Sequence, residues 1–250
     1  MSAVLEVMHL AKAFGGVQAV RDVSFEVAAG ELLAMIGPNG AGKTTCFNIL
    51  NGQLTPDAGS ARLDGHQLIG EPPAAVWRRG VGRTFQITAT FGSLTVRENV
   101  QMALLSHHRQ LGRWWVRAAG LHRHAADRLL ARVGMLAQAD RACARLAYGD
   151  LKRVELAVAL ASEPRLLLMD EPTAGMAPAE RGALMALVAE IVRERGIAVL
   201  FTEHDMDVVF AHANRIIVLA GGDVIAAGAP AAVRANAAVQ QVYFGARRPH

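Results

Sequence analysis

The chain has 250 residues, a length that allows one large domain or one domain with an inserted lobe. Apolar residues make up 52% of the chain and aromatic residues only 5%, so aliphatic side chains must fill most of the core. The formal net charge of +4 is small and no lysine-rich tract is present. The charge is therefore only weak support for a nucleic-acid or membrane-surface partner.

The sequence carries no pattern typical of export or membrane insertion. The N-terminal stretch MSAVLEVMHLAKAF lacks a basic region followed by an apolar one, and no uninterrupted apolar run reaches about 18 residues. Cys46 and Cys143 are far apart and have no metal-like spacing, so we expect buried thiols in a reducing compartment. We therefore expect a soluble cytosolic protein, unless a membrane partner recruits it.

Strand and helix patterns alternate along most of the chain. The expected elements, in chain order, are strands at 4–10 and within 23–37, a helix at 43–52, a strand at 60–65, a helical region at about 90–160, a strand at 165–170, a helix at 178–195, a strand at 197–203, a helix at 204–213 and a strand at 215–220. Strands alternating with helices favour a mainly parallel α/β sheet, here with a helical lobe inserted in the middle.

A glycine-rich loop, GPNGAGKT at Gly37–Thr44, follows the apolar strand ELLAMI and opens a helix. It matches the pattern G-x-x-x-x-G-K-[ST] in the context that this motif requires. Glycines let backbone N–H groups turn toward phosphate oxygens, and the helix N-terminus favours an anion. Lys43 would add a point charge for the β- and γ-phosphates, and the Thr44 hydroxyl would ligate Mg²⁺. The loop predicts a nucleoside triphosphate site.

Two carboxylates end the apolar stretch LLLMDE at 166–171. Asp170 comes at the end of the expected strand, where it would hold Mg²⁺, mostly through water. Glu171 follows, where it would polarise an attacking water molecule. Seen alone, such a pair also fits a helix N-cap or a solvated turn, but beside a complete phosphate loop it predicts a hydrolytic site.

These motifs, together with Gln86, LAYGDLKRVELAVAL, LLLMDEPTAGMAP and TEHD in this order, resemble the nucleotide-binding subunit of ATP-binding cassette (ABC) transporters. The resemblance covers essentially the whole chain. It implies an α/β P-loop NTPase core with an N-terminal antiparallel β subdomain and an inserted α-helical subdomain. We expect one nucleotide-binding domain over residues 1–250, with the core at about 1–88 and 162–250 and the helical subdomain at about 89–161.

Within this family, four segments resemble the branch that serves branched-chain amino acid import. They are AFGGVQAVRDVSFEV near the start, VGRTFQ at 81–86, SLTVRENV at 93–100 and VYFG at 242–245. The ATPase subunits of importers for urea or short amides are similar, and such an importer is the alternative within the family.

The resemblance assigns roles to individual residues. Glu171, His204 and Lys43 are expected to be catalytic, with His204 contacting the γ-phosphate. Mg²⁺ is expected at Thr44, Gln86 and Asp170. The residues expected to contact ATP are Phe14, Gly37, Asn39, Gly40, Ala41, Gly42, Lys43, Thr44, Thr45, Gln86, Ala147, Tyr148 and Gly149. Phe14 would stack on adenine, although from the sequence alone it also fits a core residue of the first strand. Gln86 would couple the nucleotide state to the membrane subunits.

Two positions depart from the family pattern. Ala147 stands where the signature loop of the family has a serine whose hydroxyl touches the γ-phosphate bound to the partner subunit. Ala177 stands where the loop after the catalytic glutamate commonly has aspartate. Both elements act across a dimer interface, so we expect intact ATP binding at Gly37–Thr44 and a weakened or tuned site where this signature loop completes it.

The resemblance also implies partners. Two ATP-binding subunits, the second expected to be a paralogue, would form a head-to-tail dimer on two transmembrane permease subunits. The dimer would lie peripherally at the cytoplasmic face of the inner membrane, with an external solute-binding protein acting indirectly and no nucleic acid. A soluble ABC ATPase acting on ribosomes or DNA is disfavoured. Members that act on ribosomes usually carry two cassettes, and this chain has one. Members that act on DNA need a long insertion between the P-loop half and the signature half, whereas only about sixty residues separate Gln86 from Tyr148. A non-hydrolysing regulatory module is disfavoured by the complete set of catalytic residues.

Overall fold

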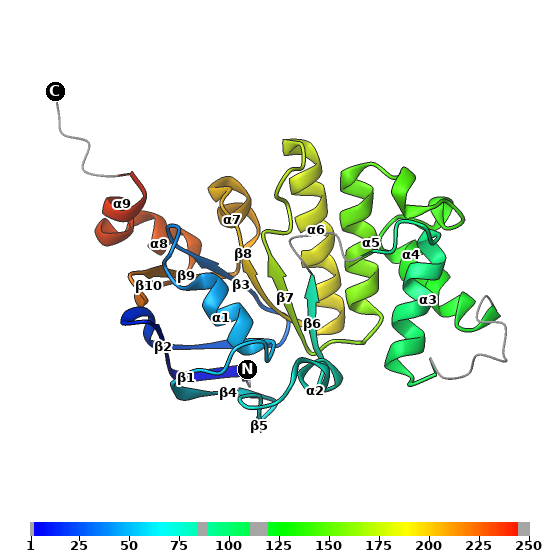
Figure 1. Cartoon of the computed structure of the whole chain (residues 1–250). Helices are drawn as coiled ribbons and strands as arrows, with labels where there is room; N and C mark the ends of the chain where they lie inside the picture. The colour runs from blue at the N-terminus through cyan, green and yellow to red at the C-terminus, as the bar shows by residue number, and fades with distance from the viewer. Residues whose placement is uncertain (1–2, 85–89, 111–119, 245–250) are drawn as a thin grey trace.

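The structure, a computed structural model, describes residues 3–84, 90–110 and 120–244. Two sheets organise it (Figure 1). The strands of the smaller, antiparallel sheet are, in spatial order, β2 (Val17–Ala28), β1 (Ala3–Phe14), β4 (Ala58–Leu63) and β5 (His66–Gln67). The strands of the larger sheet are, in spatial order, β10 (Asp223–Gly228), β9 (Arg215–Ala220), β3 (Leu32–Ile36), β8 (Ala198–Thr202), β7 (Leu166–Asp170) and β6 (Val81–Thr84). Only β10 pairs antiparallel in this larger sheet.

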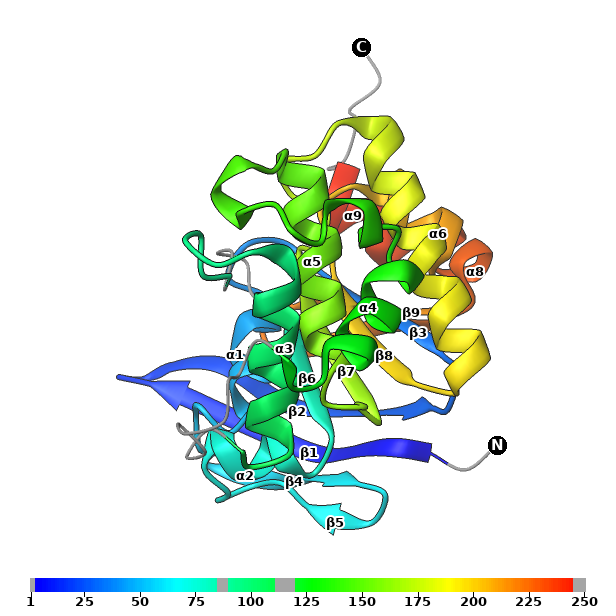
Figure 2. The same ribbon diagram turned by 90° about the vertical axis from the view of Figure 1, so that its right-hand side faces the viewer.

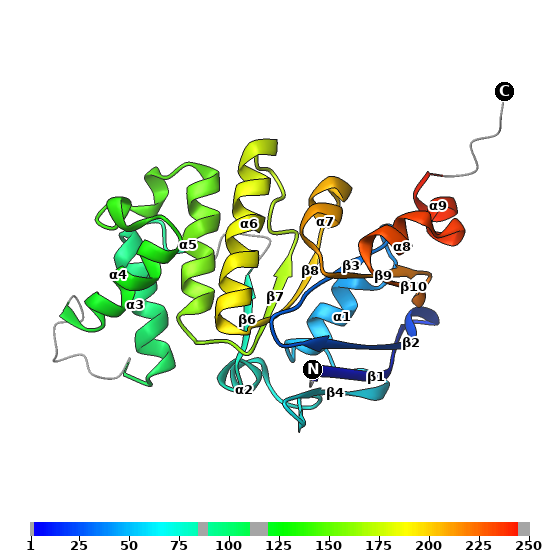
Figure 3. The same cartoon turned by 180° about the vertical axis from the view of Figure 1, so that it is seen from behind.

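Helices cover the larger sheet and form a separate layer at one end of it (Figures 1 and 3). The helices are α1 (Lys43–Leu50), α2 (Pro73–Arg78), α3 (Val96–His107), α4 (Arg123–Arg132), α5 (Tyr148–Leu160), α6 (Pro178–Arg195), α7 (Met206–His212), α8 (Pro230–Ala235) and α9 (Ala237–Phe244), with short 3₁₀ turns η2 (Leu136–Gln138) and η3 (Cys143–Arg145). Figure 2 looks onto the helical end, with α3 and α4 in front. In the described part of the chain, none of the helices combines the length and apolar character needed to cross a membrane.

The central strand β3 shows why the sequence forms two cores. All five of its residues are buried, and successive side chains point to opposite faces of the sheet. Leu32, Ala34 and Ile36 pack into a cluster with the helical end, whereas Leu33 and Met35 pack into a cluster with the antiparallel sheet and α1. The helical end and one face of the larger sheet thus share one core, and the opposite face shares the other core with the antiparallel sheet and α1. The division into subdomains at about residues 89 and 161 stays a prediction.

The helical end begins with a local signal that is visible in the sequence. Thr95 is the N-cap of α3: its hydroxyl accepts a hydrogen bond from the Glu98 amide at 3.2 Å, and the Glu98 carboxylate accepts one from the Thr95 amide at 2.7 Å. This reciprocal pair satisfies two amide groups that the first turn leaves without helical partners. The expected α/β alternation and the expected helical middle are confirmed.

Several predicted boundaries are wrong: β1 extends to Phe14 and β2 begins at Val17, and the start of α7 bears on the site. The helix expected at 204–213 begins at Met206, because Asp205 is its N-cap and accepts hydrogen bonds from the amides of Asp207 and Val208 at 3.1 and 3.3 Å. His204 therefore lies in the loop between β8 and α7 and not in the helix. Helix α2 has no counterpart among the predicted elements.

Candidate active site

The glycine-rich loop joins β3 to the N-terminus of α1. Gly37, Asn39, Gly40, Ala41 and Gly42 form the loop, and Lys43, Thr44 and Thr45 begin the helix. Two glycines have a clear steric reason. A Cβ at Gly42, where φ is +106°, would lie 2.4 Å from the Ala19 carbonyl oxygen, and a Cβ at Gly37 would lie 2.2 Å from that of Leu219. Neighbouring backbone thus shapes the loop, and only glycine fits at these two positions.

Lys43 lies over this loop and is only 8% exposed. Its ammonium donates to the carbonyl oxygens of Gly37 at 2.6 Å and Pro38 at 3.1 Å. Burial lowers the pKa of Lys43, while the nearby carboxylates of Glu171 and Asp170 act in the opposite direction. The predicted phosphate-binding lysine is therefore close to both predicted acidic residues, at the carboxyl edge of the parallel strands.

Asp170 is the last residue of β7 and is 8% exposed. Its Oδ1 accepts a hydrogen bond from the Thr202 hydroxyl at 2.6 Å, and its Oδ2 lies 3.6 Å from the Arg83 guanidinium. Burial lowers the pKa of Arg83, and Asp170 counteracts this. A buried carboxylate and the exposed hydroxyl of Thr44 are oxygen donors of the type that Mg²⁺ prefers. The donor chemistry fits the metal prediction.

Glu171 and His204 form a pair across the ends of β7 and β8. His204 Nε2 lies 2.8 Å from Glu171 Oε1. An ionised carboxylate only accepts hydrogen bonds, so Nε2 of His204 must carry the proton. The Glu171 backbone has φ +49° and is held by hydrogen bonds from its amide to the carbonyl and hydroxyl oxygens of Thr202, both at 3.1 Å. Such a left-handed conformation is costly for glutamate and is frequent where side-chain placement matters.

The predicted adenine-stacking residue lies at the end of β1. The Phe14 ring is 48% exposed, which excludes the alternative of a core phenylalanine. The Lys12 ammonium lies 5.7 Å from its ring centroid. An exposed aromatic ring can stack on a base, and its contact with adenine stays a prediction. Gln86, predicted to contact the metal, lies outside the described residues.

The signature loop starts α5. Ala147 is its N-cap, Tyr148 is 41% exposed and Gly149 is buried. A Cβ at Gly149 would lie 3.2 Å from the Glu180 carboxylate, and one at Gly175 would lie 3.3 Å from the Tyr148 ring. The loop therefore packs on the segment of the same chain that follows Glu171.

Several residues of the site were given no role in the sequence analysis. Thr202, Glu203 and Asp205 belong to the quoted segment TEHD and surround His204, and polar residues after a buried strand are a signal that could have assigned them. Arg83 could not be found in this way, because its partner Asp170 comes from a strand distant in the chain. The same holds for Tyr243 of α9, whose phenolic oxygen is hydrogen-bonded by the Gly37 backbone.

A glycine-rich loop between β3 and α1, a buried lysine over it, and an aspartate and a glutamate at the end of β7 define a P-loop nucleotide-binding ATPase. The ABC transporter family profile matches residues 20–174, and the chain belongs to that family. It binds ATP as the nucleotide-binding component of a transporter.

Relatives and solved structures agree with this assignment. The chain is 39% identical to the high-affinity branched-chain amino acid transport ATP-binding protein BraF of Pseudomonas aeruginosa, over 97% of this chain and 98% of that protein. It is 37% identical to LivG of Escherichia coli K12, of the same description, with the same coverage. The structure of MJ1267, an ATP-binding cassette of an ABC transporter in its ADP conformation, matches with a TM-score of 0.87 and 28% identity, over 98% of this chain and all of that one. The predicted family and fold are confirmed.

Proposed function

We propose that this chain is the ATP-hydrolysing subunit of a membrane importer for branched-chain amino acids. The observation that carries the proposal is similarity over nearly the whole chain to BraF and LivG, both described as ATP-binding proteins of branched-chain amino acid transport. The paired Glu171 and His204 beside Lys43 support hydrolysis rather than nucleotide binding alone.

Phosphate binding would fall to the loop and helix around Lys43. In the structure the Lys43 ammonium donates hydrogen bonds to the Gly37 and Pro38 carbonyls. When ATP binds, the ammonium must exchange these partners for the β- and γ-phosphates. Asn39, Thr45 and the loop glycines would contribute the remaining contacts, and Phe14 would stack on adenine. Thr44, Asp170 and Gln86 would hold Mg²⁺, which when bound neutralises charge on the phosphate oxygens.

Hydrolysis would start at Glu171. Its carboxylate orients a water molecule and takes up a proton as the water attacks the γ-phosphorus in line. With Glu171 as an ionised acceptor, His204 Nε2 is the donor of this pair, so it can redirect its hydrogen bond from Glu171 to a γ-phosphate oxygen and stabilise the charge that develops there. Lys43 contributes a positive charge to the same group.

The signature loop Ala147–Gly149 would complete the site of a second ATP-binding subunit, which we expect to be a paralogue in a head-to-tail dimer. Helix α5 presents its N-terminus there, and backbone amides at a helix N-terminus favour a phosphate. Closure of the dimer around two ATP molecules would drive two permease subunits between inward and outward access.

A cavity of about 280 Å³ between α2, β6, α3 and α5 supports permease docking. Its lining includes Val76, Trp77, Ala103 and Val158, and Arg83, which also lines it, pairs with Asp170. An apolar segment of a permease seated there would contact the residues just before Gln86. We place the subunit peripherally at the cytoplasmic face of the inner membrane, with the external solute-binding protein acting only through the permeases.

Transport assays on the assembled complex test the proposal. The subunit would be co-produced with its permeases, reconstituted in vesicles and supplied with solute-loaded binding protein. We expect leucine, isoleucine or valine to stimulate ATP hydrolysis. Stimulation by urea or short amides alone would overturn the cargo assignment, and a complex that transports nothing and leaves ATP intact would overturn the enzymatic role.

A further inference from the structure

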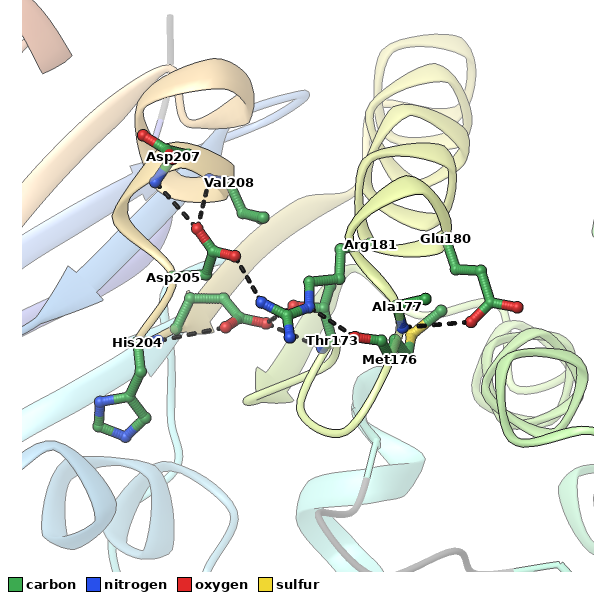
Figure 4. Close-up of polar contacts among 10 residues, drawn as sticks. Thr173, Met176, Ala177, Glu180, Arg181, His204, Asp205, Asp207 and Val208 are labelled. Carbon is green, nitrogen blue, oxygen red and sulfur yellow. Dashed lines mark hydrogen bonds and ion pairs between the residues drawn. The ribbon is translucent and has the colours of Figure 1, made fainter.

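Little of the protein packs around the His204 side chain. The imidazole is 53% exposed, so packing does not fix the ring, although it hydrogen-bonds Glu171 at 2.8 Å. Its position must then come from the backbone of the loop between β8 and α7. The two residues that flank it, Glu203 and Asp205, are both acidic and both bind the same neighbouring segment (Figure 4).

Glu203 anchors the loop on its N-terminal side. The residue is 5% exposed, and its carboxylate accepts three hydrogen bonds: from the Thr173 amide at 2.8 Å, from the Thr173 hydroxyl at 2.6 Å and from the His204 amide at 3.2 Å. A buried carboxylate is tolerated only when such donors replace water. One carboxylate therefore connects the backbone of His204 directly to Thr173.

Asp205 anchors the loop on its C-terminal side. Its Oδ1 caps α7, whereas its Oδ2 accepts a hydrogen bond from the Arg181 guanidinium at 2.6 Å. Arg181, in the first turns of α6, also donates from Nε to the Met176 carbonyl at 2.8 Å. Arginine can make both contacts because its N–H groups form a rigid fork, which lysine does not have.

Both anchors end on residues 173–181, the segment that follows Glu171 and includes the first turns of α6. Gly175 in this segment lies against Tyr148 of the signature loop. We propose that Arg181 and Glu203 are positioning residues that hold His204 at Glu171, acting through Asp205 and Thr173. Residues 173–181, which pack on the signature loop, and the loop that carries His204 then move together. This is a physical link between the signature loop and the catalytic histidine.

This inference rests on the proposed ATPase function, so the first measurement does not depend on hydrolysis. Arg181→Lys, Asp205→Asn and Glu203→Gln are made in the full chain. Asn keeps the α7 cap, and Gln keeps an oxygen for Thr173 while replacing the acceptor of the His204 amide. The matched control is Arg132→Lys, which alters an ion pair between α4 and Glu194 of the same helix α6. Imidazole ¹⁵N NMR of the nine histidines, with His204 assigned by His204→Ala, reports the ring directly.

We expect the His204 signal to move in the three variants and to stay in place in Arg132→Lys. In the transporter complex we expect each of the three to lower kcat by about 3- to 30-fold with the KM for ATP within about twofold. Arg181→Lys combined with Asp205→Asn should cost less than the sum of the two single effects, since both variants remove the contact between Arg181 and Asp205. An unmoved His204 signal overturns the inference whatever the rates do, and a moved signal with unchanged kcat overturns the catalytic part. If the wild-type complex has no ATPase activity, the proposed function fails, and the NMR result still decides how His204 is held.

Discussion

Ala147 and Ala177 occupy the same position in two helices that pack together at their N-termini. Each is an exposed N-cap residue with extended backbone, Ala147 for α5 and Ala177 for α6, and the alanine side chain has no atom that can accept a hydrogen bond from the first turn. The contact of Gly149 with Glu180 brings the two helix starts together. The two departures from the family pattern therefore have one physical consequence: both helices lack a side-chain cap where serine or aspartate would supply one.

Restoring the cap at Ala147 separates stability from function. Ala147→Ser should raise the free energy of unfolding by about 0.5–2 kcal/mol, because the hydroxyl accepts a hydrogen bond from an otherwise unpaired amide. In the complex, the same hydroxyl should strengthen ATP-dependent dimerisation by about tenfold or more, since a hydrogen bond to a charged oxygen contributes about 1.5–3 kcal/mol. Urea unfolding and sedimentation with ATP measure the two effects.

Ala229→Ser is the control, since Ala229 is the exposed, uncapped N-cap of α8 and that helix carries no part of the signature loop. We expect it to stabilise the chain by a similar amount and to leave dimerisation unchanged. If Ala229→Ser strengthened dimerisation as much as Ala147→Ser, general stability and not the signature loop would be the cause.

Glu171→Gln should stop turnover and keep ATP bound. Glutamine has the same shape and still hydrogen-bonds His204, but it cannot take a proton from water. We expect kcat in the complex to fall by at least about 100-fold, with nucleotide affinity of the chain within about threefold of wild type. Glu190→Gln, the same change at an exposed position of α6, should behave as wild type. Turnover at the wild-type rate in Glu171→Gln would remove Glu171 from the mechanism.

Thr202→Val tests how the acidic pair is held. The Thr202 hydroxyl donates to Asp170 Oδ1 at 2.6 Å and accepts from the Glu171 amide at 3.1 Å, and the residue is 1% exposed. Valine keeps the shape and removes both contacts, so we expect a loss of about 1–3 kcal/mol in the free energy of unfolding. Thr202→Ser keeps the hydroxyl and should lose less. Equal losses would mean that the methyl group, and not the hydroxyl, stabilises this position.

Local patterns predicted the parts of the site that depend on adjacent residues. The glycine-rich loop before a helix and the Asp170–Glu171 pair after an apolar strand were visible because each is contiguous in the chain. The links from Arg83 to Asp170, from Glu203 to Thr173 and from Tyr243 to Gly37 were not, since they depend on strand order and on where α9 packs. The start of α7 was misplaced for a local reason: His204 and Asp205 are both polar, and the stronger N-cap, aspartate, sets the boundary.

Tyr243 predicts a specific loss of stability in alkali. Burial raises its pKa to about 12, while the hydrogen bond from the Gly37 backbone acts in the opposite direction. The pKa of tyrosine in an unfolded chain is about 10. The folded state holds the phenolic proton more tightly, so this contribution to stability is complete below about pH 10 and is lost as the pH rises to about 12.

Tyr243→Phe removes the titrating group, so its free energy of unfolding should fall less steeply than that of wild type between about pH 10 and 12. Urea unfolding over this range measures the two slopes. The only other tyrosine, Tyr148, is 41% exposed, and Tyr148→Phe controls for the loss of a phenol as such. An equal change of slope in both variants would contradict the assignment to Tyr243. A slope change confined to Tyr243→Phe would show that the phenol of α9 is buried in the folded chain.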